Sequence, residues 1–430
     1  MTGKLLRGRV LSFLSEPKSY EDASSFQYFD DGAIVIEKGL IIETGEYAVL
    51  AKAHPDAEKI DHRPYLLMPG FVDTHLHFPQ VQVIGSFGTK LLEWLNKYTF
   101  VEEQKYADPQ HCSQMAKWFF DMLVNHGTTT AVAYCSVHKT SAEAYFTEAE
   151  NRGMRMIGGK VMMDRNAPEA LRDTPQSGYD DSKTLIEKWD GKGRSHYAIT
   201  PRFAITSTPE QMEAASALAT EFPNCYVQTH LSENDAEIEL TKELYPEARD
   251  YLDVYEQYQL LGSKSLFGHS IHLEEREIAA MADTGSVAVF CPTSNLFLGS
   301  GLFDMDGLGA AGVRSAVATD IGGGTSYSML KTMDEAYKVL QLRNQILNPL
   351  KSFYWITLGN ARALSLEDKI GTLDAGTEAD ITVLNSSATP AMALRAETVN
   401  SLSEELFVLQ TMGDDRSIKQ VYVSGKPMKS

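Results

Sequence analysis

Two histidines one residue apart, His75 and His77, close an apolar stretch that begins at Leu66. Side chains of a β-strand alternate between its faces, so residues i and i+2 point to the same side. If the strand continues through His77, both imidazoles project side by side from its carboxyl end, where they could bind one metal ion. Taken alone, the pair is equally compatible with one buried and one surface histidine that bind nothing.

Residues of similar chemistry recur further along the chain. His230, His269 and Asp320 each end a strand-like apolar run. Three imidazoles and a carboxylate suit zinc or another divalent transition metal. A lone histidine at a strand end is more often structural, but the joint placement of these residues predicts a metal site.

Such a site would need groups that handle protons. A divalent ion with an open position lowers the pKa of a bound water toward neutrality, and hydrolysis then needs a residue that accepts and returns a proton. Glu233 lies three residues beyond His230, close enough to do both. His269 could hydrogen-bond the attacking oxygen, and Asp320 could do so from the metal side. We therefore predict Glu233, His269 and Asp320 as catalytic residues.

The elements that must position these residues alternate between strand-like and helix-like segments. Eight segments read as strands, namely 66–77, 128–134, 155–163, 196–200, 225–230, 265–269, 286–290 and 314–320. The alternation predicts an α/β fold with parallel pairing, and eight repeats predict a (β/α)8 TIM barrel, whose active-site residues lie at the carboxyl ends of the strands. The alternative is a doubly wound open sheet, but its edge strands should be more polar than these.

Both ends of the chain have a different character. Residues 1–65 and 371–430 hold short alternating strands separated by turn signals such as Asp30-Asp-Gly32. We expect the two ends to combine into one small β-sandwich-like domain beside a barrel formed by residues 66–370.

Composition limits the kinds of partner. The chain has 430 residues and a net charge of −19, which argues against nucleic acid and against an anionic membrane surface. The four cysteines are far apart, so reduced thiols are expected rather than disulfides or a thiolate metal site. The sequence has no apolar run long enough for a membrane span and no apolar segment typical of a signal peptide near Met1. These features favour a soluble cytoplasmic protein.

Several motifs give the chain a resemblance that spans nearly its whole length. The sequences Pro-Gly-Phe-Val-Asp-Thr-His-Leu-His at 69–77, His-Leu-Ser-Glu at 230–233, Cys-Pro-Thr-Ser-Asn-Leu at 291–296 and Thr-Asp-Ile-Gly-Gly-Gly at 319–324 resemble the amidohydrolase superfamily. Within it, the chain resembles the guanine deaminases through His-Phe-Pro-Gln at 77–80, Leu-Glu-Trp-Leu at 92–95 and Arg-Phe at 202–203.

This resemblance implies a role for each matching residue. The implied ligands of one zinc ion per chain are His75, His77, His230 and Asp320. Glu233 would be the proton shuttle, with His269 beside the water. The implied substrate contacts are His77, Phe78, Pro79, Gln80, Arg202, Phe203, His230, Glu233 and Asp320. The resemblance also implies a homodimer.

The chemistry of two implied contacts agrees with a purine substrate. Gln80 can donate and accept hydrogen bonds at once, and Arg202 can donate to the carbonyl of guanine. The alternative is that Gln80 is an ordinary polar loop residue and Arg202 part of a salt bridge at the barrel rim. Trp94 and Leu95 could line the pocket or simply pack a helix.

One lysine bears on the number of metal ions. Many members of the superfamily carry a carboxylated lysine that bridges two metals on the fourth strand. Here Lys160 lies on the third predicted strand and Arg202 on the fourth, and an arginine cannot be carboxylated in this way. We therefore expect one metal ion and a structural role for Lys160.

Three functions remain open at this point. The leading one is hydrolytic deamination of guanine to xanthine and ammonia. The second is a related mononuclear hydrolase acting on another aminopurine, a pterin or a triazine. The third, a non-catalytic scaffold, is disfavoured because the implied ligands and Glu233 are all present.

Overall fold

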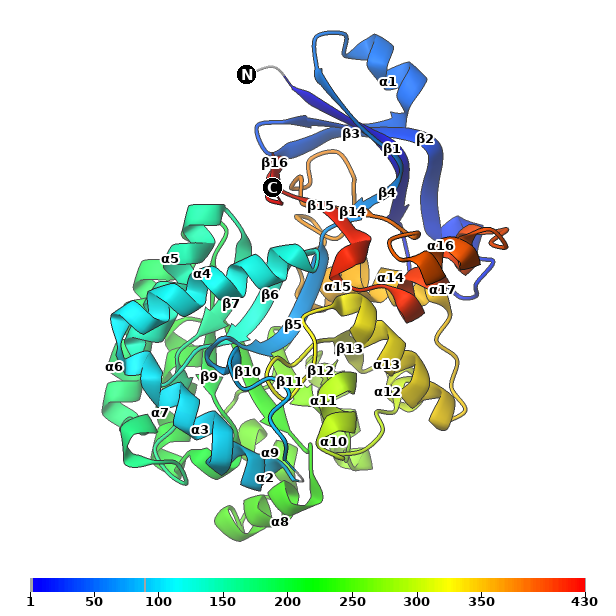
Figure 1. The fold of residues 1–430 in the computed structure, drawn as a ribbon. Helices are drawn as coiled ribbons and strands as arrows, with labels where there is room; N and C mark the ends of the chain where they lie inside the picture. Colours follow the sequence, from blue (N-terminus) through cyan, green and yellow to red (C-terminus); the bar gives the residue numbers. More distant parts are fainter. Residues whose placement is uncertain (1–2, 89, 430) are drawn as a thin grey trace.

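A ring of parallel strands forms the centre of the computed structural model, which describes residues 3–88 and 90–429. Each strand is hydrogen-bonded to the next along the chain, apart from the short β8 (Val161–Met162), which pairs with β9. The ring strands are β5 (Phe71–His77), β6 (Thr128–Tyr134), β7 (Arg155–Gly159), β9 (His196–Pro201), β10 (Tyr226–Leu231), β11 (Ser265–His269), β12 (Val287–Phe290) and β13 (Arg314–Val317). The predicted TIM barrel is confirmed, although the first and last of its strands are shorter than expected (Figure 1).

The barrel closes where the chain leaving β13 meets β5. The backbone N–H of Asp320 donates to the carbonyl of His75 at 2.9 Å, and that of His77 donates to the carbonyl of Ile321 at 2.5 Å. These bonds join the first strand of the barrel to the segment after the last one. Closure therefore brings Asp320 beside the two histidines of β5.

Helices cover the outside of the ring (Figure 1). Those around the barrel are α4 (Pro109–Asn125), α5 (Lys139–Arg152), α6 (Pro175–Trp189), α7 (Pro209–Glu221), α8 (Asp235–Leu244), α9 (Tyr251–Gln257), α10 (Glu275–Thr284), α11 (Pro292–Phe297), α12 (Met305–Ala310), α13 (Met329–Leu342), α14 (Pro349–Tyr354) and α15 (Asn360–Ala363). Thr208 caps α7, since its hydroxyl accepts from the N–H of Gln211 at 3.2 Å.

A short helical segment interrupts the path from β5 to α4. It contains the 3₁₀ turn Phe78–Gln80, then α2 (Leu91–Trp94), the π-helical turn Leu95–Thr99 and α3 (Phe100–Glu103). In Figure 1, α2 and α3 lie at the part of the barrel away from the sheet formed by the termini. This segment is therefore placed to cover the carboxyl ends of the strands.

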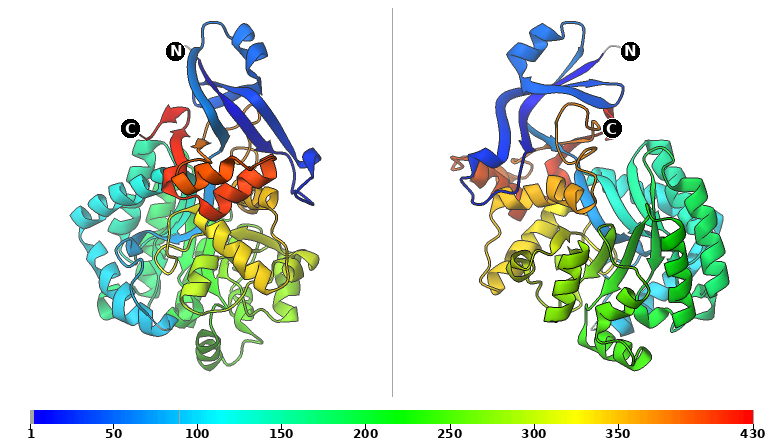
Figure 2. Two further views of the ribbon diagram at one scale, coloured as in Figure 1. Left: turned by 45° about the vertical axis from the view of Figure 1, so that its right-hand side comes forward. Right: turned by 180° about the vertical axis from the view of Figure 1, so that it is seen from behind.

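The two ends of the chain share one seven-stranded sheet. Its order is β16 (Lys426–Pro427), β15 (Ile418–Val423), β14 (Ile381–Leu384), β4 (Glu58–Pro69), β1 (Lys4–Phe13), β2 (Phe26–Glu37) and β3 (Leu40–Glu46). Because β4 pairs with β14, strands from both termini lie side by side, as expected (Figure 2). The flanking helices are α1 (Tyr47–Ala53), α16 (Pro390–Ala396) and α17 (Leu402–Met412).

Gly70 divides the single strand expected over residues 66–77. The chain leaves the terminal sheet at Pro69 and enters the barrel at Phe71. A Cβ atom at Gly70 would lie 2.1 Å from the hydroxyl oxygen of Thr129, so only glycine fits this close crossing to β6. The Pro-Gly interruption in the sequence thus marks the passage from one sheet to the other.

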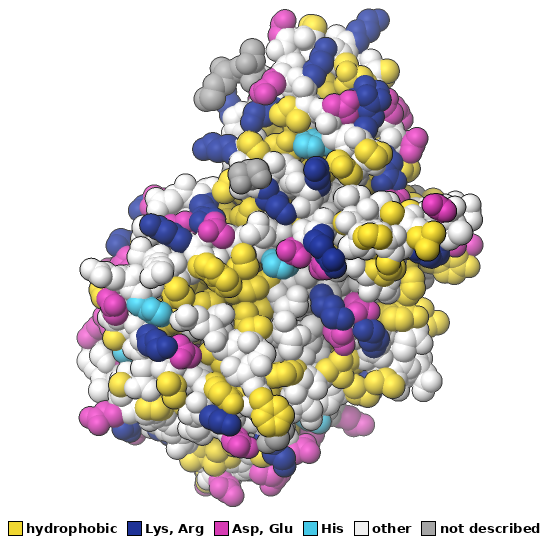
Figure 3. Space-filling view, viewed as in Figure 1, with side chains coloured by type: hydrophobic (Ala, Val, Ile, Leu, Met, Phe, Trp, Pro, Cys, Tyr) yellow, Lys and Arg dark blue, Asp and Glu magenta, His cyan; other side chains and the backbone are white. Residues whose placement is uncertain are grey.

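The interior of the barrel is filled by aliphatic side chains. Val72, Val132, Ile157 and Leu266 come from different strands and belong to one buried cluster. On the outside, charged residues of both signs are interspersed with apolar ones across the face shown in Figure 3. The four cysteines are free and buried, and within residues 3–88 and 90–429 no helix is long and apolar enough to cross a membrane.

Candidate active site

Four side chains predicted as metal ligands meet at the carboxyl end of the barrel. The His77 and His230 Nε2 atoms lie 3.1 Å apart. Asp320 Oδ1 lies 3.4 Å from the Nε2 atoms of both His75 and His77. All four residues are buried. The barrel thus brings together residues that are up to 245 positions apart, the separation of His75 and Asp320 (320 minus 75).

These side chains fit a divalent cation. Burial lowers the pKa of His75, His77 and His230, so their imidazoles are neutral and can offer lone pairs. His75 Nε2 is buried and has no hydrogen-bond partner among the described residues. An unsatisfied buried nitrogen costs free energy, and an ion between these imidazoles and the carboxylate would satisfy it.

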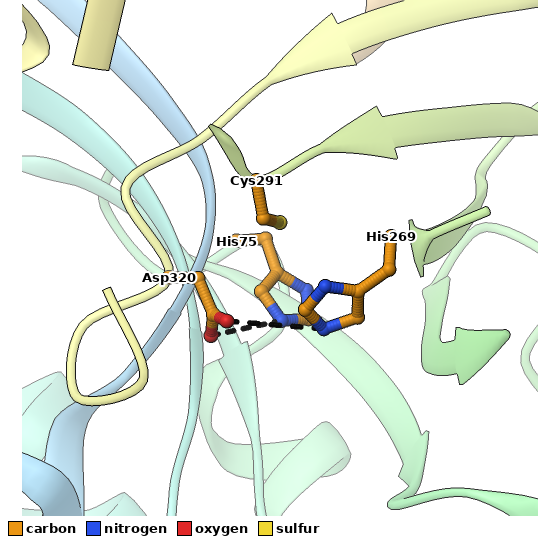
Figure 4. A group of neighbouring side chains, drawn as sticks. All are labelled: His75, His269, Cys291 and Asp320. Atoms are coloured by element: carbon orange, nitrogen blue, oxygen red, sulfur yellow. Dashed lines mark ion pairs between the residues drawn. The ribbon is translucent and has the colours of Figure 1, made fainter. Parts of the chain in front are cut away.

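A second group of potential ligands overlaps the first. It contains His75, His269, Cys291 and Asp320, whose side chains point toward one another in Figure 4. Burial raises the pKa of the Cys291 thiol well above its ordinary value, so the sulfur stays protonated. Together the two groups contain all four side chains that we predicted as metal ligands.

Local contacts orient each imidazole. His230 Nδ1 lies 2.7 Å from the carbonyl oxygen of Arg202, and a proton held there leaves Nε2 free for a metal. His77 stacks on Tyr134 with ring centroids 4.6 Å apart. His75 packs against Gly268, where an added Cβ would lie only 2.6 Å from the ring. Each of these three imidazoles is therefore held by residues from another part of the barrel.

Glu233 and His269 form a pair beside the ligands. Glu233 Oε2 lies 3.4 Å from His269 Nε2, and the Ser300 hydroxyl donates to Glu233 Oε1 at 3.0 Å. Burial raises the pKa of Glu233 to about 7, although the charge of His269 opposes the rise. Such a carboxyl group can both accept and donate a proton near neutral pH.

Opposing effects set the pKa values of the neighbouring groups. Burial disfavours the charged form of His269, but Glu233 and Asp320 outweigh it and raise the pKa of the imidazole. Burial also disfavours ionised Asp320, yet the contact of its Oδ1 with His75 Nε2 at 3.4 Å and the charge of His269 lower its pKa to about 2. Asp320 is therefore a carboxylate, as a metal ligand must be.

A pocket opens beside these groups, with about 380 Å³ of space that protein atoms do not fill, including open solvent. Its lining combines acid–base groups, two polar side chains and an apolar wall: His77, Gln80, Leu91, Trp94, Leu95, Arg202, Phe203, His230, Glu233, His269, Leu298, Asp320 and Gly323.

Most of the predicted substrate contacts line this cavity, but two do not. Phe78 is buried against Tyr106 and Phe119, and Pro79 is buried beside it in the 3₁₀ turn. Trp94 and Leu95, for which pocket lining and helix packing were equally open, do line the cavity.

Lys160 and His272 lie outside the ligand cluster. Lys160 is buried and forms a 2.5 Å ion pair with Asp173, which agrees with a structural role. His272 Nε2 lies 2.8 Å from the carbonyl oxygen of Ser300, the residue that donates to Glu233. It therefore supports the site from a distance.

Sequence reasoning missed three supporting residues. Asn295 Oδ1 lies 2.9 Å from His269 Nδ1, Ser300 bonds Glu233, and Glu103 binds both Gln80 and Arg202. Asn295 belongs to the motif at 291–296 and could have been noticed there. Nothing in the sequence distinguishes Glu103 or Ser300 from other polar residues.

The chain is similar over its full length to several known proteins. A guanine deaminase from Escherichia coli K12 is 47% identical over 427 residues, covering 99% of this chain and 97% of that protein. The solved guanine deaminase of Bradyrhizobium japonicum has a TM-score of 0.97 at 37% identity, covering 100% of this chain and 99% of that one. The guanine deaminase of C. acetobutylicum with bound guanine in the active site has a TM-score of 0.89 at 28% identity, covering 100% of both chains. The sequence profile of the amidohydrolase family matches residues 66–428, and the chain therefore belongs to the amidohydrolase family.

Proposed function

We propose that this protein is a guanine deaminase that hydrolyses guanine to xanthine and ammonia. The observation that carries the proposal is the shared cavity, in which Gln80 and Arg202 line the same space as Glu233 and the metal-ligand cluster. The similarity to proteins named guanine deaminase, one of them solved with guanine in its active site, supports it.

We propose one zinc ion held by His75, His77, His230 and Asp320. When bound, zinc would supply a Lewis acid that brings the pKa of a water molecule near neutrality. Glu233 would accept a proton at Oε2 from the attacking water and return it to the leaving amine. A pKa of about 7 lets Glu233 serve both steps at neutral pH. His269, 3.4 Å from Glu233, can donate a hydrogen bond to the oxygen that attacks the ring.

We propose that guanine lies with its amine-bearing C2 toward Glu233 and its carbonyl toward Arg202. The guanidinium donates to the carbonyl, and Gln80 contributes both an amide donor and an acceptor. Phe203, Trp94 and Leu298 supply apolar surface for the ring. Adenine lacks the carbonyl, so it would leave polar groups of the pocket unpaired.

The assembly and the location of the protein also remain proposals. We propose a homodimer, as the family resemblance implies. We propose a cytoplasmic location because four free, buried cysteines suit a reducing compartment. Light scattering on the purified protein and fractionation of cells test these two statements.

The first experiment combines metal analysis with a substrate panel. We expect one divalent ion per chain, loss of activity after dialysis against a chelator, and recovery when Zn²⁺ is added. Ammonia release is measured with guanine, adenine, cytosine, a pterin and an aminotriazine. Guanine should have by far the highest kcat/KM. If another ring matches it, the guanine assignment is wrong while the amidohydrolase family stands.

A further inference from the structure

A buried carboxylate lies behind the two polar residues of the pocket. Glu103, the last residue of α3, is 1% exposed. Its two oxygens accept from the same Arg202 nitrogen, NH1, at 2.8 and 3.0 Å, and Oε1 also accepts from Gln80 Nε2 at 2.9 Å. Glu103 is not among the residues that line the cavity. It can therefore reach a ligand only through Gln80 and Arg202.

These bonds decide which atoms of Arg202 are left for a ligand. NH1 is occupied by Glu103. Among the residues that the structure describes, no acceptor bonds Arg202 Nε or NH2. The remaining N–H groups of the guanidinium are donors without a protein partner, on a residue that lines the cavity. A carbonyl oxygen is the complementary group on a ligand.

Glu103 also fixes the amide of Gln80. The amide nitrogen donates to Glu103, so the amide cannot flip without placing its oxygen against a carboxylate. Within the described part of the chain, Gln80 Oε1 accepts only a long bond of 3.4 Å, from the N–H of Gly322. That oxygen is therefore available to accept from a ring N–H of a ligand.

The environment of the three residues makes this arrangement rigid. The guanidinium of Arg202 lies over the ring of Phe100, three residues before Glu103, with its central carbon 5.4 Å from the ring centroid. A buried carboxylate and a buried guanidinium each depend on the other, because either one alone would be an uncompensated charge. Groups fixed before the ligand arrives lose little entropy on binding.

We propose that Glu103 is a positioning residue that fixes the hydrogen-bonding pattern of Gln80 and Arg202 and thereby sets the preference for a purine with a carbonyl at C6. The inference rests on the proposed function of the same site. Guanine and 2-aminopurine share the amine at C2 but differ at C6, where 2-aminopurine has no carbonyl, and at N1, where it has no N–H. The pair therefore probes together the two contacts, from Arg202 and from Gln80, that Glu103 controls.

The test compares wild type, Glu103→Gln and the control Glu102→Gln as zinc-loaded full chains. Glu102 is the preceding residue and pairs with Lys105 at the surface. We expect Glu103→Gln to lower kcat/KM for guanine by about 10²-fold, mainly through KM, and to change the inhibition constant of 2-aminopurine by less than about threefold. Glu102→Gln should leave both values unchanged.

Other outcomes would overturn the inference. One such outcome is that Glu103→Gln lowers kcat/KM for guanine and raises the inhibition constant of 2-aminopurine by the same factor, and another is that it changes neither value. Either result would show that Glu103 does not set the preference. If Glu103→Gln does not fold, Glu103→Asp replaces it. Aspartate keeps the charge on a side chain that is shorter by one methylene, and the same two values, kcat/KM for guanine and the inhibition constant of 2-aminopurine, are compared. Wild type with full zinc content that releases no ammonia from guanine would instead refute the proposed function.

Discussion

At the scale of single residues, the site depends on charges held away from water. Burial raises the pKa of Glu233 to about 7, whereas the imidazoles around Asp320 overcome burial and lower its pKa to about 2. Two carboxyl groups of one cavity thus differ in the pH at which they ionise, which suits the proton carrier and the metal ligand that we propose. Environments that separate the pKa values of neighbouring acids in this way are typical of acid–base catalysis.

Replacement of Glu233 by glutamine tests its role as proton carrier. Glu233→Gln should keep the zinc content and fold but lose about 10²-fold or more in kcat, because an amide cannot accept the proton of water. Ammonia release and metal analysis measure this. Glu239→Gln, on the exposed surface of α8, is the control and should behave as wild type. Near wild-type turnover of Glu233→Gln would reject the role.

The Arg202–Glu103 pair gives a prediction about stability. Arg202→Met leaves Glu103 as a buried charge without its cation, which should lower the free energy of unfolding by about 3–5 kcal/mol. Adding Glu103→Gln removes that charge, so the double variant should recover at least half of the loss. Denaturant unfolding of the three proteins measures the coupling. Simple additivity of the two substitutions would contradict it.

At the scale of elements, several barrel strands carry site residues at or just beyond their carboxyl ends, where side chains of other strands pack against them. β5 supplies His75 and His77, and β11 supplies both His269 and the glycine against which His75 packs. The strands therefore position one another, and the geometry of the ligands depends on small residues as well as on the ligands themselves.

Gly268 provides a test of this dependence. Gly268→Ala would place a methyl group 2.6 Å from the ring of His75, so the imidazole must move. We expect zinc affinity to fall by about 10- to 100-fold, the usual effect of disturbing the support of a ligand. Gly262→Ala is a matched control, since its Cβ would meet only the Ser265 hydroxyl at 3.9 Å. Unchanged zinc affinity of Gly268→Ala would show that His75 has room to adjust.

At the scale of the whole molecule, a charged network fastens the terminal sheet to the barrel. Glu378, just before β14, accepts from Arg155 Nε of β7 at 2.8 Å and also pairs with Arg194. Arg194 NH1 in turn donates to Asp380 at 3.1 Å. Arg155 begins its strand, so this contact lies at the amino end of the barrel, the end opposite to the site. We propose that this network joins two structural units. One is formed by residues 1–65 together with 371–430, and the other by residues 66–370.

Glu378→Gln should weaken this junction in a pH-dependent way. Burial disfavours ionised Glu378, but Arg155 and Arg194 outweigh it and hold its pKa below the ordinary value of 4.5. The unfolded chain therefore binds this proton more readily, so the stabilisation is complete above pH 4.5 and is lost as the pH falls through the lowered pKa. We expect wild type and Glu378→Gln to differ in unfolding free energy by about 3 kcal/mol at pH 7. This difference should become smaller as the pH is lowered toward about 3.

The control for this comparison is Asp374→Asn, an exposed neighbour on the same segment. It should show no such pH-dependent difference from wild type. Turnover of guanine at pH 7 should be unchanged in both variants, since the junction is at the far end of the barrel. A difference for Glu378→Gln that stays constant with pH would contradict the assigned role of its charge.

The sequence by itself determined the barrel, the joining of the two termini and the placement of most site residues. Strand-like apolar runs alternate with helix-like segments along the chain, so the strands can be predicted locally. The predicted ligands lie at the ends of these runs, which the sequence shows directly. His75, His77, His230 and Asp320 were therefore predictable as neighbours before any coordinate was known. Gln80 and Arg202 were found through the family resemblance.

Only the tertiary structure decided what lies behind those residues. Glu103 and Arg202 are 99 positions apart, and no local pattern indicates that α3 folds back over the pocket to pair them. The same holds for Ser300 beside Glu233 and for the division of the first strand at Gly70, where Thr129 leaves no room for a side chain. Spacing along the chain records which face of a strand a residue occupies. It does not record which distant carboxylate or hydroxyl will be buried against it, because that depends on how the loops pack once the barrel has closed.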